Sequence, residues 1–105
     1  LINGQPVVFL LDTGATVLSI PESVAERIGL ERGKPSRVAT ANGTVNVYST
    51  RLEKVQLGNI AIRNVQGHIN PHMGGETALL GMSFLKHLEL IQSGDTLTLK
   101  APVGS

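Results

Sequence analysis

The feature that most constrains this chain is an apolar run at residues 7–11 that leads directly into Asp12 and the turn residues Thr13 and Gly14. A continuous apolar run of this kind predicts a strand that is buried on both faces. An ionised Asp at the end of such a strand is destabilising by several kcal/mol unless hydrogen-bond donors or a shared proton compensate. The Thr13 hydroxyl and the backbone amides of the glycine turn are such donors. Asp12 is therefore a candidate catalytic acid or base.

An Asp in a glycine turn also has an ordinary structural function, because its side chain often caps the turn. The triplet Asp-Thr-Gly does not distinguish the two functions by itself, since three residues recur by chance. The choice depends on the surroundings of Asp12, which are an apolar strand before the triplet and small residues after it.

The composition limits the class of protein. With 105 residues, 41% of them hydrophobic and 16% charged, the chain is expected to form one domain over residues 1–105. Aromatic residues are scarce, so Val, Leu and Ile must fill the core, and with 12 glycines this predicts a mostly β protein. A net charge of +1 with scattered basic residues does not support nucleic-acid binding. Because the chain has no cysteine, disulfides and thiolate metal sites are excluded.

The sequence contains no apolar run that approaches the roughly 20 residues of a membrane span. It opens within a strand-like pattern, which predicts that an N-terminal strand is truncated. Any attachment to a membrane would then come from a missing N-terminal anchor.

Glycine turns and hydrophobic periodicity divide the chain into short elements. We expect a helix that begins near Pro21 and ends at Gly29, a loop at residues 66–77, and a short helix over residues 82–88. Alternating or apolar segments between turn residues predict strands and hairpins. These are a turn at Asn3-Gly4, a hairpin at 38–48 with its turn at Asn42-Gly43, strands at 51–57, 60–65 and 78–81, and a hairpin turn at 93–95.

Two parts of the chain, residues 2–29 and 57–88, repeat the same order of turn, strand, apolar run ending in glycine, and short helix. Such repetition predicts two similar halves packed about a pseudo-twofold axis. Only the first half contains Asp-Thr-Gly, and the second has Gly81 at the equivalent turn. Asp95 lies in a polar turn, so the sequence predicts one catalytic carboxylate per chain.

Three motifs arrive in an order that is typical of a known family: residues 9–16 around Asp12, the hairpin residues 40–44, and residues 79–81 before the second helix. With them the chain resembles the retropepsin-like aspartic proteases, and most of all their bacterial, membrane-tethered members. The resemblance implies a mostly β, retropepsin-like closed barrel or sandwich that has one or two short helices and forms a homodimer. It also implies a periplasmic location with an inner-membrane anchor.

The resemblance further implies an aspartic endopeptidase that acts on protein or peptide substrates. Asp12 of each chain would activate water, Thr13 would brace the two loops across the dimer axis, and Gly14 would bring its backbone amide close to the carboxylates. The hairpin would cover an extended peptide and open and close over it. The expected site residues are Asp12, Thr13 and Gly14 for catalysis and Ala15, Thr40, Ala41, Asn42 and Gly43 for substrate binding.

A second copy of the chain is expected because peptide hydrolysis needs one group to deprotonate water and another to protonate the substrate carbonyl. Two carboxylates that share a proton do both, and a twofold axis through the site supplies the second Asp12. No cofactor is expected. Retroviral members of the family pair an Asp with an Arg at the positions of Thr16 and Met82, so this chain lacks that ion pair and its dimer must be held in another way.

Two other interpretations of the sequence stay open. His68 and His72 are four residues apart, but they lie in a Pro/Gly-rich segment rather than on a helix, so their spacing does not define a metal site. A retropepsin fold that serves only as a dimerisation or peptide-binding module is the second alternative, because activity depends on geometry and not on a motif. For an active enzyme, pocket walls of Val, Ile, Leu and Ala favour apolar side chains next to the scissile bond.

Overall fold

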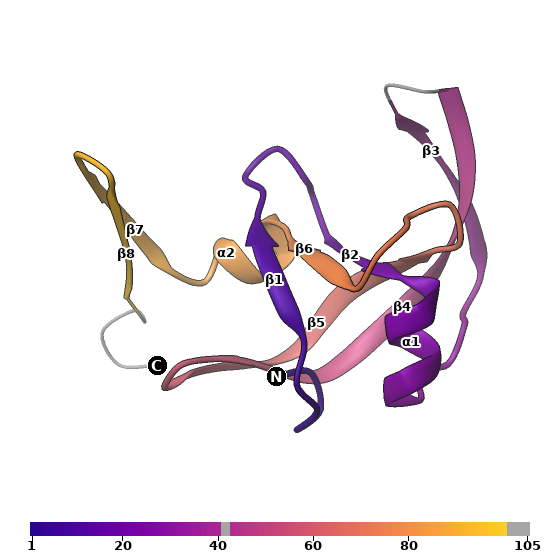
Figure 1. Cartoon of the computed structure of the whole chain (residues 1–105), viewed down its shortest axis with the longest axis horizontal. Helices are drawn as coiled ribbons and strands as arrows, with labels where there is room; N and C mark the ends of the chain where they lie inside the picture. The colour runs from indigo at the N-terminus through magenta and orange to yellow at the C-terminus, as the bar shows by residue number, and fades with distance from the viewer. Residues whose placement is uncertain (41–42, 101–105) are drawn as a thin grey trace.

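The computed structural model describes residues 1–40 and 43–100 of the chain, and its main feature is a mixed six-stranded sheet with strand order β1-β6-β2-β5-β4-β3 (Figure 1). A separate two-stranded sheet, β7-β8, follows it. The helices and strands are β1 (Val8–Leu11), β2 (Leu18–Pro21), α1 (Glu22–Ile28), β3 (Pro35–Thr40), β4 (Gly43–Leu57), β5 (Ile60–Asn70), β6 (Thr77–Leu80), α2 (Met82–Leu85), β7 (Glu89–Ser93) and β8 (Thr96–Lys100).

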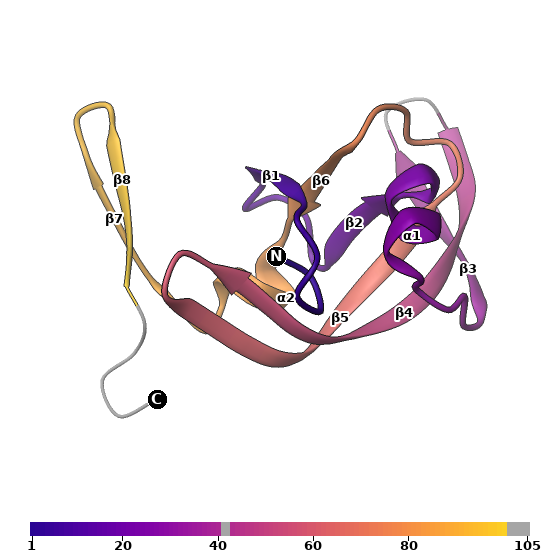
Figure 2. The same cartoon turned by 60° about the horizontal axis from the view of Figure 1, so that its bottom comes forward.

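The predicted mostly β class with two short helices is confirmed, but the expected closed barrel is wrong. Strands β1 and β3 end the six-stranded sheet on its two sides, and within the described residues they do not pair with each other. The long β4-β5 hairpin twists and curls along its length, so the sheet wraps around the core without closing (Figure 2). Among the described residues no helix is long and apolar enough to cross a membrane.

Helix α1 forms where the sequence predicted it. Glu22 lies in the first turn, Val24 and Ala25 are buried, and Gly29 ends the helix in a left-handed conformation with a φ of 77°. The second helix is shorter than the expected 82–88, since α2 covers only four residues. Both helices contribute to one core, whose buried side chains are Ile2, Leu18, Ile20, Val24, Ala25, Leu52, Val55, Val65, Ile69, Ala78, Leu80, Phe84 and Leu85.

Strand β1 departs from its prediction. We expected residues 7–11 to be buried on both faces, but Val8 is 68% exposed and Leu10 is 60% exposed. The reason is topological, because β1 is the last strand of the sheet and, among the residues that the structure describes, pairs with β6 alone. Strand β1, whose sequence is as apolar as that of a core strand, therefore has one uncovered face at the edge of the sheet.

The expected loop at residues 66–77 is confirmed over residues 71–76, but its first part, up to Asn70, is a strand. Strand β5 continues to Asn70, and only the segment between Asn70 and Thr77 is a loop. The physical reason is that β5 lies in the middle of the sheet, between β2 and β4. His68, for example, is paired with Ser19 on one side and Ser49 on the other. Two partner strands outweigh a local composition that favours turns.

The predicted turns at the two ends of the chain are confirmed. Asn3 and Gly4 have φ values of 51° and 81°, as a type I′ hairpin turn requires. Gly94 connects β7 to β8 with a φ of 57°. In both cartoon views the β7-β8 hairpin projects away from the six-stranded sheet (Figures 1 and 2).

Candidate active site

Asp12 lies immediately after β1, in the loop that leads to β2. Its backbone N–H donates to the carbonyl oxygen of Leu80 at 3.1 Å, and its carbonyl oxygen accepts from Ala15 N at 3.1 Å. The Gly14 N–H donates to Asp12 Oδ1 at 3.0 Å. A Cβ atom on Gly14 would lie 3.3 Å from that oxygen, so glycine is the residue that lets the amide reach the carboxylate without displacing it. Hydrogen bonds to the backbone of Asp12 and to its side chain thus hold the half-buried carboxylate in place.

The glycine turn after β6 supports this loop. Strands β1 and β6 run parallel as neighbours, so the turns that follow them lie side by side. Met82 N donates to Ala15 O at 2.8 Å. A Cβ atom on Gly81 would overlap the carbonyl of Val17 and would lie 2.9 Å from Ala15 O. The Asp–Arg ion pair of retroviral members is absent here, as the sequence indicated from Thr16 and Met82, and a backbone hydrogen bond joins the two turns within the chain.

Ser83 is a residue that supports the site from outside the cavity lining, and the sequence analysis missed it. Its hydroxyl donates to Gln66 O at 2.7 Å and accepts from Leu18 N at 3.3 Å, so it joins α2 to β5 and to the start of β2. The only signal in the sequence was its position in the segment Leu-Leu-Gly-Met-Ser-Phe-Leu, two residues after Gly81. Its function could not be predicted because both partners are distant in sequence.

The Asp12 carboxylate is in the wall of a cavity of about 550 Å³. Strand alternation explains the lining: Leu18 and Ile20 of β2 are in the core, so Ser19 between them points to the other face. Ala78 and Leu80 place Leu79 on that face in the same way. The lining residues are Asp12, Gly14, Ala15, Thr16, Val17, Ser19, Val38, Ala39, Val45, Val47, His68, Asn70, His72, Met73 and Leu79.

The structure brings several predicted site residues together. Asp12, Gly14 and Ala15 line the cavity, whereas Thr13 is exposed and outside the lining. Strands β3 and β4 form the predicted hairpin, with Thr40 paired to Gly43 at its end, and their neighbouring residues line the same cavity. Predicted Ala41 and Asn42 lie outside the described residues. Gly43 begins β4 with a φ of 109°.

His68 and His72 both line the Asp12 cavity. Partial burial lowers the pKa of His68 below its usual value, because the protonated ring is less well solvated there. Within residues 1–40 and 43–100, no three side chains of the His, Cys, Asp and Glu types are grouped as metal ligands would be. The two histidines therefore belong to the wall of the cavity.

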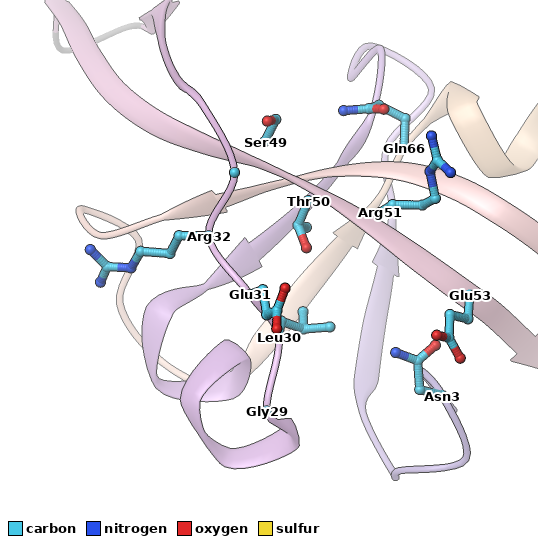
Figure 3. Close-up of a pocket in the computed structure, with 11 residues that line it drawn as sticks. Asn3, Gly29, Leu30, Glu31, Arg32, Ser49, Thr50, Arg51, Glu53 and Gln66 are labelled. Carbon is cyan, nitrogen blue, oxygen red and sulfur yellow. The ribbon is translucent and has the colours of Figure 1, made fainter.

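A second cavity, of about 580 Å³, shares no residue with the first and lies between the segment after α1 and strands β4 and β5 (Figure 3). Its charged residues are of both signs, and Arg32 and Arg51 lie on opposite sides of it (Figure 3). Arg32 forms an ion pair with Glu22, and its guanidinium lies 4.7 Å from the centre of the Tyr48 ring. These contacts anchor the loop after α1, and we assign no chemistry to this cavity.

Comparison with known proteins agrees with this geometry. Residues 1–87 match the family described as gag-polyprotein putative aspartyl protease. An uncharacterised protein from the cobV 5′ region of a Sinorhizobium species is 33% identical over 94 residues, which are 87% of this chain and 40% of that protein. The uncharacterised protein RP867 of Rickettsia prowazekii is 28% identical over 92 residues, or 84% of this chain and 38% of its own length. The chain thus spans about two fifths of these curated relatives.

Two solved structures are similar in fold. A retropepsin-like aspartic protease from Rickettsia conorii superposes with a TM-score of 0.79 at 28% identity, covering 93% of this chain and 76% of that one. The EIAV protease in complex with the inhibitor HBY-793 gives a TM-score of 0.60 at 24% identity, covering 81% of this chain and 79% of that one. The second likeness concerns the fold alone. With the loop around Asp12 and the match over residues 1–87, the chain belongs to the gag-polyprotein aspartyl protease family and has the retropepsin-like fold.

Proposed function

We propose that this chain is one subunit of a homodimeric aspartic endopeptidase in which two Asp12 carboxylates activate a water molecule. The observation that carries the proposal is the setting of Asp12. It is the one carboxylate among the described residues of its cavity wall, and the Gly14 amide holds it at 3.0 Å. A single fixed carboxylate beside a cavity is half of the pair that this reaction uses.

The proposed reaction needs an acid and a base at the same place. When two Asp12 side chains meet across a twofold axis, the repulsion of two like charges keeps one proton on the pair. The ionised carboxylate removes a proton from water as it attacks the substrate carbonyl carbon, and the protonated one donates to the carbonyl oxygen. The carboxyl group that took the proton from water then passes it to the amide nitrogen, and the C–N bond breaks. The other carboxylate recovers a proton from a hydroxyl of the intermediate, so that an amine and a carboxylic acid are released.

The uncovered face of β1 supports the requirement for a second copy. Val8 and Leu10 are large apolar side chains, mostly exposed, on the strand that immediately precedes Asp12. Exposed Thr13 follows directly and is free to contact the equivalent loop of the partner. A second chain placed across this edge would cover the apolar face and bring the two Asp12 loops together.

The substrate is proposed to be an extended peptide that lies between the Asp12 loop and the β3-β4 hairpin. Val38 and Ala39 of β3 and Val45 and Val47 of β4 line the same cavity as Asp12. Backbone groups at a hairpin bind extended peptides, and side-chain pockets beside it give specificity.

Asp12→Asn tests the proposal, because the amide keeps the shape of the side chain and cannot accept the proton of water. Wild type and variant are incubated with a mixed peptide library at high protein concentration, from acidic to neutral pH, and products are identified by mass spectrometry. We expect discrete cleavage products with wild type and a loss of at least about a thousandfold in the variant. Circular dichroism of both proteins checks that the fold is unchanged.

Cleavage by both proteins at equal rates would refute the assignment of Asp12. If neither cleaves any peptide while the wild-type chain binds library members, the chain would be a peptide-binding module with the protease fold. This alternative shares the cavity but not the chemistry.

A further inference from the structure

We infer that the cavity beside Asp12 selects a substrate side chain of the glutamine type, with an apolar stem and an uncharged amide end, and that His68 determines this selection. This inference rests on the proposed function. It also departs from the apolar preference that the sequence alone suggested, because polar residues lie in the cavity wall, among them Ser19, His68 and Asn70.

The polar residues are placed together by strand pairing. Ser19 of β2 is paired with Leu79 of β6 on one side and with His68 of β5 on the other. These three residues therefore form a row across neighbouring strands, on the face opposite the core. Asn70 lies two residues after His68 on β5, so its side chain is on the same face. The row begins apolar at Leu79 and becomes polar at Ser19 and His68.

The polar groups in this row have hydrogen-bonding capacity left for a ligand. Among the described residues, neither the Ser19 hydroxyl nor the His68 ring forms a hydrogen bond with another protein group. Asn70 Oδ1 accepts from the backbone N–H of His72 at 2.9 Å, which leaves the amide NH₂ of Asn70 as a donor. A bound peptide would remove water from these groups, so a side chain that replaces those hydrogen bonds is favoured over one that does not.

The charges in the cavity favour an uncharged partner. The described lining contains no Lys or Arg, so a substrate carboxylate would find no fixed cation there, and it would lie in the same cavity as Asp12. The lowered pKa of His68 favours the neutral imidazole, which donates from one nitrogen and accepts at the other. An amide likewise has one donor and one acceptor group. The valines of β3 and β4 and Leu79 provide apolar contact for the stem of the side chain.

The test compares Gln with Leu at each of the three positions on either side of the cleaved bond. Pairs of peptides that differ only at that position compete in one reaction, and the ratio of kcat/KM is read by mass spectrometry. At one of these positions wild type should prefer Gln by about tenfold. His68→Leu should bring that ratio to one or below, whereas His87→Leu, an exposed histidine outside the cavity, should keep the wild-type ratio.

Ser19→Ala provides a second variant in case His68→Leu folds poorly, and it should reduce the same ratio without reversing it. A Leu preference in wild type, or a Gln preference that survives both substitutions, would overturn the inference while leaving the protease assignment intact. The same peptides are bound to the Asp12→Asn chain and followed by fluorescence anisotropy. Selective binding of the Gln peptide there, together with no cleavage by wild type, would support the pocket assignment and contradict the proposed catalysis.

Discussion

Gly81 shows how much of the candidate site depends on a single residue. The loop after Asp12 and the turn after β6 approach so closely that Gly81 has the backbone of Ala15 and Val17 where a side chain would be. The hydrogen bond from Met82 N to Ala15 O depends on the same approach. The glycine therefore permits the contact that positions the loop of Asp12.

Gly81→Ala should lower the free energy of unfolding by about 3 kcal/mol, because the new methyl group must push apart two segments of backbone. Gly74→Ala is the matched control, since a Cβ atom there meets nothing within 4 Å. It should change the free energy by less than about 0.5 kcal/mol. Urea denaturation followed by circular dichroism measures both values. Equal midpoints for the two variants would contradict the close packing at Gly81.

At the scale of helices and strands, the sequence predicted the features that depend on residues close together in the chain. Gly29 at the end of α1 and the turns at Asn3-Gly4 and Gly94 follow from side-chain and backbone preferences within a few residues, and all are in the structure. Asp12 in its glycine turn is local in the same sense. The function of Ser83 is not, because its partners are Gln66 and Leu18.

The predictions for strands β5 and β1 were wrong for two different reasons. Residues 66–70 have a turn-like composition, but β5 has partner strands on both sides, which a single sequence does not reveal. The apolar sequence of β1 indicates burial on both faces, and this chain covers only one of them. The polar wall at Ser19 and His68 was missed for a related reason, since it depends on pairing between distant strands.

The exposed face of β1 leads to a prediction about Leu10. Leu10→Glu should change stability by less than about 0.5 kcal/mol, because the side chain is 60% exposed, but it should weaken self-association and cleavage together. Ala61→Glu, an exposed position of β5, is the control for an added charge on a strand. Sedimentation velocity and peptide cleavage at matched concentrations give the two readouts. Unchanged association and activity in Leu10→Glu would exclude this face from the dimer.

At the scale of the whole molecule, three features are related: the open sheet, the uncovered edge strand β1, and the one carboxylate in the described cavity wall, that of Asp12. The six-stranded sheet ends at β1, and the one Asp12 follows that strand. The sheet has two edge strands, but the core needs no partner to fill it, because the core side chains are already buried within one chain. Its proposed chemistry nevertheless needs a second copy, so folding and activity should depend differently on protein concentration.

The most direct test of the central claim mixes wild type with Asp12→Asn at a fixed total concentration, after joint refolding so that subunits pair at random. If each site uses one Asp12 from each of two chains, activity should follow the square of the wild-type fraction, and an equal mixture should retain about one quarter of it. A linear dependence, with about one half retained in the equal mixture, would mean that each chain works alone, and it would contradict the shared site.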